Sequence, residues 1–492
     1  MTETEAQVAR WFEGRAEQVV ETACARVYLA GDTAWKVKRD VDLGYVDFST
    51  PGKRRWALER ELAFNKPAAP DIYRALHRFT RTEGGLELDG QGEVVEYALE
   101  MRRFSQDAVL AAHPERIDGE LAELLGRTVA GFHAGAELRP AGGLTALAWT
   151  VGSNASLLRE LKPRLGDQRV ETLVALTEAE LERQSPLLAH RATAGFARRC
   201  HGDLHLGNIL VEDGRPILFD CIEFNDLLSD LDVQYDIAFL LMDLDFRGRR
   251  DAGVRVLSAW LDEVARSLPQ EIWAGLAALP LMLSARAAVR AHVAAHAGDD
   301  ELSKAYVDAG IAHLSPAPPR LLAVGGLSGS GKSTFARAVA PSLGASPGAV
   351  VLRTDEIRKR LLNVASTQPM GREVYTPEFY VQTYDTLFDT ARALLQAGRA
   401  VVLDATFMDA PLRARAEQLA GDCAVPFDAV WLEAPAAVLE ARVAARTNDA
   451  SDATLPVVQD QLRRFDASGL AWPRVDATDV EASARAWAKA SG

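Results

Sequence analysis

The chain has 492 residues, of which 48% are hydrophobic and 25% are charged, so it can bury more than one hydrophobic core and is not a mostly disordered protein. It carries 55 Lys and Arg against 69 Asp and Glu, a formal net charge of −14, which disfavours general binding to nucleic acid or to anionic membranes. The first residues include acidic side chains and no apolar segment typical of a secretory signal, and no uninterrupted apolar run approaches the roughly 20 residues of a membrane span.

The first 315 residues are expected to form a small β-rich part, about 20–104, followed by a larger helical part, about 105–315. Two strands are predicted within 26–38, joined at Gly31-Asp32, and a further strand within 93–104. Helical patterns and one β-type segment (209–220) make up the rest, the helical ones covering residues 52–66, 117–134, 153–164, 168–190 and 231–313.

A proline-rich connector at 316–319 ends the helical part, because such a stretch cannot continue a helix. The net charge is −13 before residue 320 and −1 from there on, so only residues 320–492 would tolerate a phosphate-rich partner. In this second part strand-like apolar runs alternate with helical stretches, which predicts a parallel sheet of βαβ units, with strands at 321–325, 349–353, 400–404 and 428–432.

The string HGDLHLGN at 201–208, followed by an apolar strand ending in Asp220, has the layout of a kinase catalytic loop. Phosphoryl transfer needs a carboxylate that accepts the hydroxyl proton, and an amide and a second carboxylate that hold Mg²⁺ against the phosphates. Asp203, Asn208 and Asp220 offer these groups in that order. A hairpin turning at 212–214 would bring the two metal ligands together.

With HGDLHLGNIL followed by LFDCIEFN, the region resembles the aminoglycoside phosphotransferase family, the small-molecule branch of the kinase-like fold. The resemblance covers about 20–310 and implies a bilobal protein-kinase-like fold with ATP between the lobes. It also implies that Asp203 is the catalytic base, that Asn208 and Asp220 bind magnesium, and that His205 orients the loop.

The family also uses an ATP-binding lysine on a small-lobe strand, paired with a helical glutamate. Lys36, in the string TAWK, matches this position, and Lys38 on the same strand face is the alternate. Glu61 and Glu59 are both candidates for the glutamate. The chain departs from the kinase pattern in having no Gly-rich loop before the lysine and Cys-Ile-Glu after Asp220.

Two further groups of polar residues in the helical part are expected to be structural. Asp230, Asp232 and Asp236 form an acidic run that we interpret as helix caps or surface residues. A helix further on presents basic residues at i,i+4 spacing, without the third ligand that a metal site needs, so a solvated face is expected at Arg286, Arg290, His292 and His296.

The string GLSGSGKST at 326–334 matches G-x-x-x-x-G-K-[ST] in full, after an apolar strand and before a helical stretch. Backbone N–H groups at a helix N-terminus form a ready anion site, and glycines keep side chains away from the phosphates. Lys332 would reach the β- and γ-phosphates and Ser333 would hold Mg²⁺. The nucleotide-binding candidates in this motif are Gly326, Gly329, Gly331, Lys332, Ser333 and Thr334.

Polar residues follow the other predicted strands of this part, where sites gather in doubly wound sheets. With the glycine-rich motif they resemble the small P-loop kinases, such as polynucleotide 5′-hydroxyl kinases, zeta-toxin-like kinases and antibiotic O-phosphotransferases. The resemblance implies Asp355 as general base, Arg358 as a substrate or phosphate contact and Asp404 as a residue near Mg²⁺. It implies a lid that stabilises transition-state charge and contains Arg442 and Arg446.

The pairing of both halves resembles bacterial bifunctional proteins that join an aminoglycoside phosphotransferase-like domain to an ATP-binding predicted kinase with a doubly wound P-loop NTPase fold. We therefore expect ATP and Mg²⁺ in both domains and a small-molecule hydroxyl as the acceptor, with neither nucleic acid nor membrane as a partner. Four cysteines far apart in the sequence favour a reducing, cytoplasmic location. The alternatives are a nucleotide-sensing module coupled to a P-loop ATPase, and a nucleic-acid 5′-hydroxyl kinase in the second domain.

Overall fold

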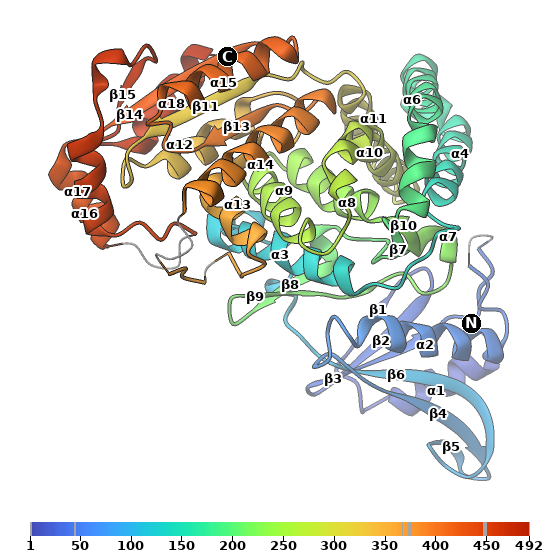
Figure 1. The fold of residues 1–492 in the computed structure, drawn as a ribbon. Helices are drawn as coiled ribbons and strands as arrows, with labels where there is room; N and C mark the ends of the chain where they lie inside the picture. The colour runs from blue at the N-terminus through green and yellow to red at the C-terminus, as the bar shows by residue number, and fades with distance from the viewer. Residues whose placement is uncertain (1, 44–45, 367, 372–375, 446–449, 492) are drawn as a thin grey trace.

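The computed structural model describes residues 2–43, 46–366, 368–371, 376–445 and 450–491. The chain folds into two domains of mixed α/β type (Figure 1). A small antiparallel sheet and a group of long helices form the N-terminal domain, and a parallel sheet flanked by helices forms the C-terminal domain.

The small lobe is a six-stranded antiparallel sheet in the order β1-β2-β3-β6-β4-β5. Its strands are β1 (Gln18–Glu21), β2 (Ala25–Ala30), β3 (Thr33–Lys38), β4 (Tyr73–Thr82), β5 (Gly85–Leu88) and β6 (Glu93–Arg102), and its helices are α1 (Glu3–Phe12) and α2 (Pro51–Asn65). The β2–β3 hairpin turns at Gly31-Asp32 as predicted, because Gly31 adopts a positive φ of 58° there. Helix α2 begins after Thr50, whose side chain accepts from the Lys53 amide, and its buried face packs on β6.

The helical lobe holds nine helices in the described chain and two short strand pairs, β7 with β10 and β8 with β9. The helices are α3 (Gly119–Gly135), α4 (Leu144–Glu160), α5 (Lys162–Leu165), α6 (Asp167–Thr193), α7 (Asp226–Ser229), α8 (Val233–Phe246), α9 (Arg250–Val264), α10 (Leu279–His296) and α11 (Asp300–His313). The strands are β7 (Ala197–Arg199), β8 (Ile209–Glu212), β9 (Arg215–Leu218) and β10 (Asp230–Asp232).

The segment Gln270–His296, which includes α10, is long and apolar enough to cross a membrane by length and composition. Arg286 and Arg290 interrupt it, so it is not the continuous apolar run that the sequence was expected to lack. Its most apolar window is 78% buried inside the protein, against α8, α11 and α4. It therefore packs as a core helix.

The C-terminal domain is a five-stranded parallel sheet in the order β12-β13-β11-β14-β15, with β11 at its centre. Its strands are β11 (Leu321–Gly326), β12 (Val350–Arg353), β13 (Val401–Asp404), β14 (Phe427–Glu433) and β15 (Arg474–Asp476). Its helices are α12 (Lys332–Val339), α13 (Thr354–Leu361), α14 (Pro377–Gln396), α15 (Ala410–Asp422), α16 (Ala436–Ala444), α17 (Leu455–Arg464) and α18 (Val480–Ser491). Such a sheet places the carboxyl ends of β11, β12 and β13 at one edge, where the predicted site residues follow.

The two domains pack directly on each other through α9, which lies against β12, α12 and α13. Leu257 and Trp260 of α9 belong to the same apolar core as Leu352 of β12. On the other face of the sheet, Val254 packs with Leu322 in a second core. The apolar core is therefore continuous across the junction, which favours one fixed arrangement of the domains.

Candidate active sites

The structure places the predicted catalytic loop of the N-terminal domain between β7 and β8. Asn208 donates from Nδ2 to Oδ2 of Asp203 at 2.8 Å and to its carbonyl oxygen at 2.9 Å. His205 lies on the other side, with Nε2 3.4 Å from the same Oδ2. His201 accepts from the Asp203 amide at Nδ1, and its Nε2 lies 2.9 Å from the Phe219 carbonyl, which can only accept. The proton of His201 is therefore on Nε2, and its ring holds the loop.

The electrostatics of this loop keep Asp203 ionised. Burial by itself would raise the pKa of the Asp203 carboxyl, but its neighbours, His205 first and then Arg286, outweigh that effect and lower the pKa. Burial lowers the pKa of His201, which keeps that ring neutral. An ionised carboxylate beside an amide is suited to accept a proton from a bound hydroxyl.

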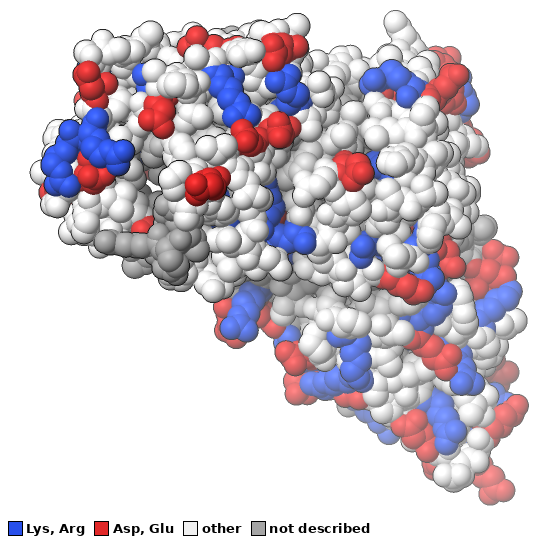
Figure 2. Space-filling model, viewed as in Figure 1, with Lys and Arg blue, Asp and Glu red and all other residues white. Residues whose placement is uncertain are grey.

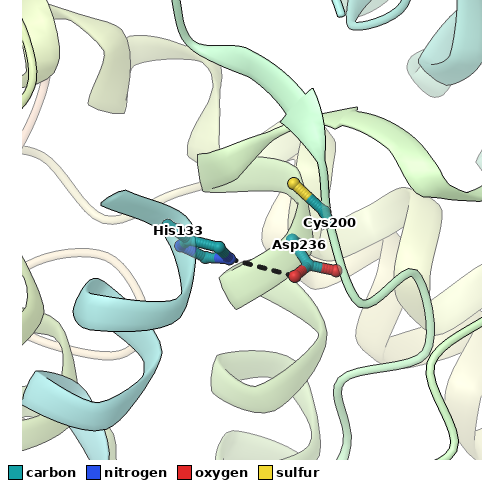
Figure 3. A group of neighbouring side chains, drawn as sticks. All are labelled: His133, Cys200 and Asp236. Atoms are coloured by element: carbon teal, nitrogen blue, oxygen red, sulfur yellow. Dashed lines mark hydrogen bonds and ion pairs between the residues drawn. The ribbon is translucent and has the colours of Figure 1, made fainter. Parts of the chain in front are cut away.

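The loop is fixed from below by Asp236 of α8, which accepts from the amides of His201 (3.1 Å) and Gly202 (2.8 Å). The expectation that Asp236 is a cap or surface residue is wrong, since its side chain is fully buried. Three different donors satisfy it, which is what allows a carboxylate to be buried. Its third donor is Nε2 of His133, at 3.0 Å (Figure 3).

His133, Cys200 and Asp236 form a buried group whose possible metal-ligand atoms lie within 4.8 Å of one another (Figure 3). Their hydrogen bonds already use these atoms. Trp260 donates to Nδ1 of His133, Nε2 of His133 pairs with Asp236, and the Cys200 thiol donates to the Leu231 carbonyl. The group therefore acts as a hydrogen-bonded support under the catalytic loop, and not as a metal site.

Asp220 lies at the end of the β8–β9 hairpin, beside Asn208, since the Phe219 amide donates to the Asn208 carbonyl. Asp220 has a φ of 62°, a left-handed conformation that is costly for a residue with a side chain. The hydroxyl of Tyr73 accepts from the Asp220 amide and helps to hold this conformation. Neither Tyr73 nor the strained conformation was predicted from the sequence.

Lys36 joins the two lobes at this point. Its Nζ lies 2.6 Å from Oε1 of Glu61 and 2.9 Å from Oδ1 of Asp220. Of the two candidate glutamates, the structure thus places Glu61 at the lysine, whereas Glu59 is exposed and pairs with Arg55. Burial by itself would raise the pKa of Glu61, but the ammonium groups of Lys36 and Lys38 lower it to about 2.

Lys38, the alternate to Lys36 in the sequence, has its own set of ion-pair partners. Its Nζ lies 2.7 Å from Oε2 of Glu61 and 2.6 Å from Oε1 of Glu223, and both partners are almost fully buried. Burial raises the pKa of Glu223. The two lysines lie on the same strand face and share Glu61, but only Lys36 contacts Asp220 and only Lys38 contacts Glu223.

In the C-terminal domain, the glycine-rich loop has a backbone that side chains would not permit. Gly326, Gly329 and Gly331 have φ values of 147°, 85° and 90°. A Cβ on Gly329 would lie 2.5 Å from the Leu439 carbonyl, and one on Gly331 would lie 2.5 Å from Val480. The loop leads directly into α12, so its backbone lies at a helix N-terminus, the arrangement that binds phosphates.

The side-chain oxygens of Ser333 and Asp404, the predicted Mg²⁺ ligands, lie together beside this loop. The hydroxyl of Ser333 donates to Oδ2 of Asp404 at 2.6 Å, and Arg353 donates from Nε to the same oxygen at 3.3 Å. Asp404 ends β13, which lies next to β11 in the sheet. Nζ of Lys332 donates to the Leu327 carbonyl at 3.0 Å, so the lysine curls over the loop.

A cavity of about 1390 Å³ extends from the glycine-rich loop across the carboxyl edge of the sheet. Thr334 lines its loop end, and Asp355 and Arg358 line the far part, where they form an ion pair at 2.5 Å. Tyr380 lines it as well and donates to Asp409 at 2.7 Å. The cavity is therefore large enough for a nucleotide and an acceptor together.

The predicted lid is described only in part. Arg442 lines the cavity and donates to the carbonyls of Ala477 and Thr478. Arg446 lies outside the described residues. Gln461 of α17 accepts from the Ser328 amide at 2.8 Å, so a helix beyond the lid contacts the glycine-rich loop. Sequence reasoning did not single out Gln461.

The residues present fit Mg²⁺ and ATP in both domains. Asn208 and Asp220 in one domain, and Ser333 and Asp404 in the other, offer the oxygen ligands that Mg²⁺ prefers. The glycine-rich loop keeps its conformation only with glycines, because a Cβ on Gly329 or Gly331 would collide with Leu439 or Val480. Each site also presents a lysine.

Two other expectations about the helical lobe need correction. Arg286 is only 4% exposed, not solvated, because it donates to the Gly202 and Tyr235 carbonyls and lies over the Tyr235 ring. Asp232 caps α8 as expected, but it is also buried in a pair with Arg191 at 2.7 Å. In both cases distant segments supply the partners that burial requires.

Comparisons with known proteins cover both domains. The family model described as "Phosphotransferase enzyme family" matches residues 57–279, and the one described as "AAA domain" matches residues 321–468. Uncharacterized protein Rv2004c of Mycobacterium tuberculosis is 32% identical over 460 residues, covering 89% of this chain and 88% of that protein. Uncharacterized protein Mb2027c of Mycobacterium bovis matches to the same extent.

Other similar proteins match a smaller share of the chain. An adenylyl-sulfate kinase of Myxococcus xanthus is 34% identical over 117 residues, 24% of this chain and 59% of that protein. A gluconokinase from Sinorhizobium meliloti 1021 is 21% identical and covers 35% of this chain and 93% of its own, with a TM-score of 0.26. An APS kinase from Mycobacterium tuberculosis is 20% identical, with 35% and 97% covered and a TM-score of 0.27.

Proposed function

This chain belongs to the same family as the two mycobacterial proteins and joins a phosphotransferase-type domain to a P-loop kinase-like domain; we propose that each domain transfers the γ-phosphate of ATP to a hydroxyl of a small molecule. One observation carries the proposal. In each domain, segments far apart in the sequence bring a carboxylate, a lysine and oxygen ligands for Mg²⁺ into one site. We expect the protein in the cytoplasm, because its four cysteines are unpaired.

In the N-terminal domain, Asp203 takes the proton of the acceptor hydroxyl as that oxygen bonds to the γ-phosphorus and displaces ADP. Asn208 orients the Asp203 carboxylate and, with Asp220, would hold Mg²⁺. Lys36, oriented by Glu61, would contact the nucleotide phosphates. Mg²⁺-ATP, when bound, supplies the phosphoryl group and a divalent charge that offsets the developing negative charge.

In the C-terminal domain, Asp355 has the corresponding role as proton acceptor for the attacking hydroxyl, and Arg358 orients it through their ion pair. The amides of the glycine-rich loop and Lys332 would bind the phosphates, and Ser333 and Asp404 would hold Mg²⁺. Arg442 would belong to the lid over the nucleotide.

A small molecule is favoured over nucleic acid as the acceptor. On the face shown in Figure 2, basic and acidic side chains of the described residues are interspersed and form no continuous basic strip. Phosphate-backbone binding relies on such a strip.

The test measures ADP release from ATP and Mg²⁺ with panels of sugars, nucleosides and aminoglycosides. Asp203→Asn should abolish one acceptor-dependent rate and Lys332→Ala the other. Asp213→Asn, the same change at an exposed turn of the β8–β9 hairpin, and Lys489→Ala, at the exposed end of α18, are the matched controls. If an acceptor-dependent rate persists in both Asp203→Asn and Lys332→Ala, the assignment of these two sites to phosphotransfer is wrong.

A further inference from the structure

The interface between the domains contains a carboxylate that contacts both of them. Glu123, on α3 of the N-terminal domain, accepts from Arg255 of α9 at 3.0 Å. The same Oε1 lies 2.8 Å from Nη2 of Arg337, which belongs to α12 of the C-terminal domain. Helix α12 is the one that begins at Lys332, directly after the glycine-rich loop.

From Arg337 a series of alternating charges continues to the metal-binding carboxylate. Nη2 of Arg337 lies 3.8 Å from Oε1 of Glu356, which lies 2.9 Å from Nη1 of Arg353. Arg353 then reaches Oδ2 of Asp404 from Nε at 3.3 Å. Arg353 and Asp404 are each only 4% exposed, so water screens their interaction little.

The docking of the domains holds this series in place. Asp262 of α9 lies 2.5 Å from Arg360 of α13, and Arg266 donates to the Lys359 and Val364 carbonyls at 3.4 and 2.6 Å. The Val351 amide of β12 donates to the hydroxyl of Ser258 at 3.3 Å. Glu123 therefore meets Arg337 at a fixed position.

The contacts of Glu123 should strengthen Mg²⁺ binding at Asp404. Arg353 and Mg²⁺ compete for the same oxygen of Asp404, so Mg²⁺ binds better when Arg353 is held elsewhere. Glu356 holds the other end of Arg353. Because Glu123 neutralises Arg337, it leaves Glu356 available to Arg353.

We propose that Glu123 of the N-terminal domain is a positioning residue for the P-loop kinase site, which makes Mg²⁺ binding by the C-terminal domain depend on the docked N-terminal domain. The proposal rests on the function proposed above for the C-terminal domain. Without Glu123, Arg337 draws Glu356 toward itself, and Arg353, which already reaches Oδ2 of Asp404 at 3.3 Å, loses the pull of Glu356 and pairs more closely with Asp404. Both the geometry and the added positive charge then weaken Mg²⁺ binding.

Removal of Arg337 should act in the opposite direction. Glu356 would then serve Arg353 alone, and Glu123 would keep Arg255 as its partner. An interface that merely supports the fold would make both substitutions weaken the site. Opposite signs therefore separate a positioning role from a structural one.

The experiment uses the full chain with Asp220→Asn, which removes the metal-binding carboxylate of the N-terminal site. β,γ-Imido-ATP binding is titrated against Mg²⁺, and the Mg²⁺ concentration that half-saturates the gain in nucleotide affinity is measured alongside the thermal unfolding midpoint. Glu123→Gln should raise that concentration about tenfold, the lower end of the range for residues behind a metal ligand. Glu120→Gln, at an exposed position of the same helix, controls for the change in net charge.

Arg337→Met should lower the concentration, and the double variant Glu123→Gln/Arg337→Met should match Arg337→Met alone. The proposal is overturned if Glu123→Gln shifts Mg²⁺ binding no more than Glu120→Gln, or if its shift persists in the Arg337→Met background. If Lys332→Ala leaves nucleotide binding by this chain unchanged, the proposed function of the C-terminal domain fails, whatever Glu123 does.

Discussion

Nζ of Lys36 lies 2.9 Å from Oδ1 of Asp220, although 184 residues separate the two in the sequence. Lys36 is on β3 of the small lobe, and Asp220 follows the β8–β9 hairpin of the helical lobe. The contact therefore crosses the junction between the lobes. It brings a cation to the carboxylate that is proposed to hold Mg²⁺, and this position separates Lys36 from Lys38.

The two lysines should respond differently to the same substitution. Lys36→Met should lower N-terminal phosphotransfer at least about a hundredfold, because orientation of the phosphates contributes that much or more. Lys38→Met should instead lower the free energy of unfolding by about 3 kcal/mol, because it leaves Glu223 buried without its cation. Acceptor-dependent ADP release and urea unfolding measure the two effects.

The control for Lys38 is the double variant Lys38→Met/Glu223→Leu, which removes both buried charges and should recover most of the stability. The assignment of the nucleotide-binding role to Lys36 would be wrong if Lys38→Met kept its stability and lost phosphotransfer.

The stability of the N-terminal domain should fall in acid through Glu61. Its pKa in the folded protein is about 2, against an ordinary value of 4.5. A carboxyl with a lowered folded pKa contributes stability that is complete above 4.5 and is lost as the pH falls toward 2. Urea unfolding between pH 7 and pH 3 should show this loss, and Glu61→Gln should make the pH dependence shallower. An unchanged dependence in that variant would contradict the ion-pair account.

Local sequence was enough to predict the loop at 201–208, the glycine-rich loop and four strands of the parallel sheet, but not its short edge strand β15. A fixed spacing holds Asp203 near Asn208, and a buried parallel strand such as 321–326 is a continuous apolar run. Strand β4 was missed because its arginines and histidine hide the alternation of a half-exposed antiparallel strand. The choice of Glu61 over Glu59 depends on which face of α2 meets the sheet, and that is decided by tertiary packing.

The burial of Asp236 could not be predicted from the sequence. A buried carboxylate and a surface carboxylate look the same in a sequence, and what distinguishes this one is its distant partners. His133 lies 103 residues before it, and the amides of His201 and Gly202 lie more than 30 residues before it. Only the folded chain brings them together.

The support beneath the catalytic loop should be required for both stability and N-terminal catalysis. His133→Ala leaves the Trp260 N–H without an acceptor and removes one donor from Asp236, so the free energy of unfolding should fall by about 2–4 kcal/mol. Phosphotransfer that depends on Asp203 should fall as well, because Asp236 positions the loop amides. His190→Ala, at an exposed position of α6, is the control. Native stability in His133→Ala would show that this network contributes little.

The glycine-rich loop offers a test that separates the two nucleotide sites. Gly329→Ala forces a Cβ to within 2.5 Å of the Leu439 carbonyl at a φ of 85°, so the loop must shift and its amides no longer form the phosphate cradle. Calorimetric titration with Mg²⁺ and β,γ-imido-ATP should fall from two sites per chain to one, while phosphotransfer that depends on Asp203 stays unchanged. Gly421→Ala, on α15 with nothing within 4 Å of its new Cβ, should keep both sites. Two sites of native affinity in Gly329→Ala would mean that the loop does not bind the phosphates through its backbone.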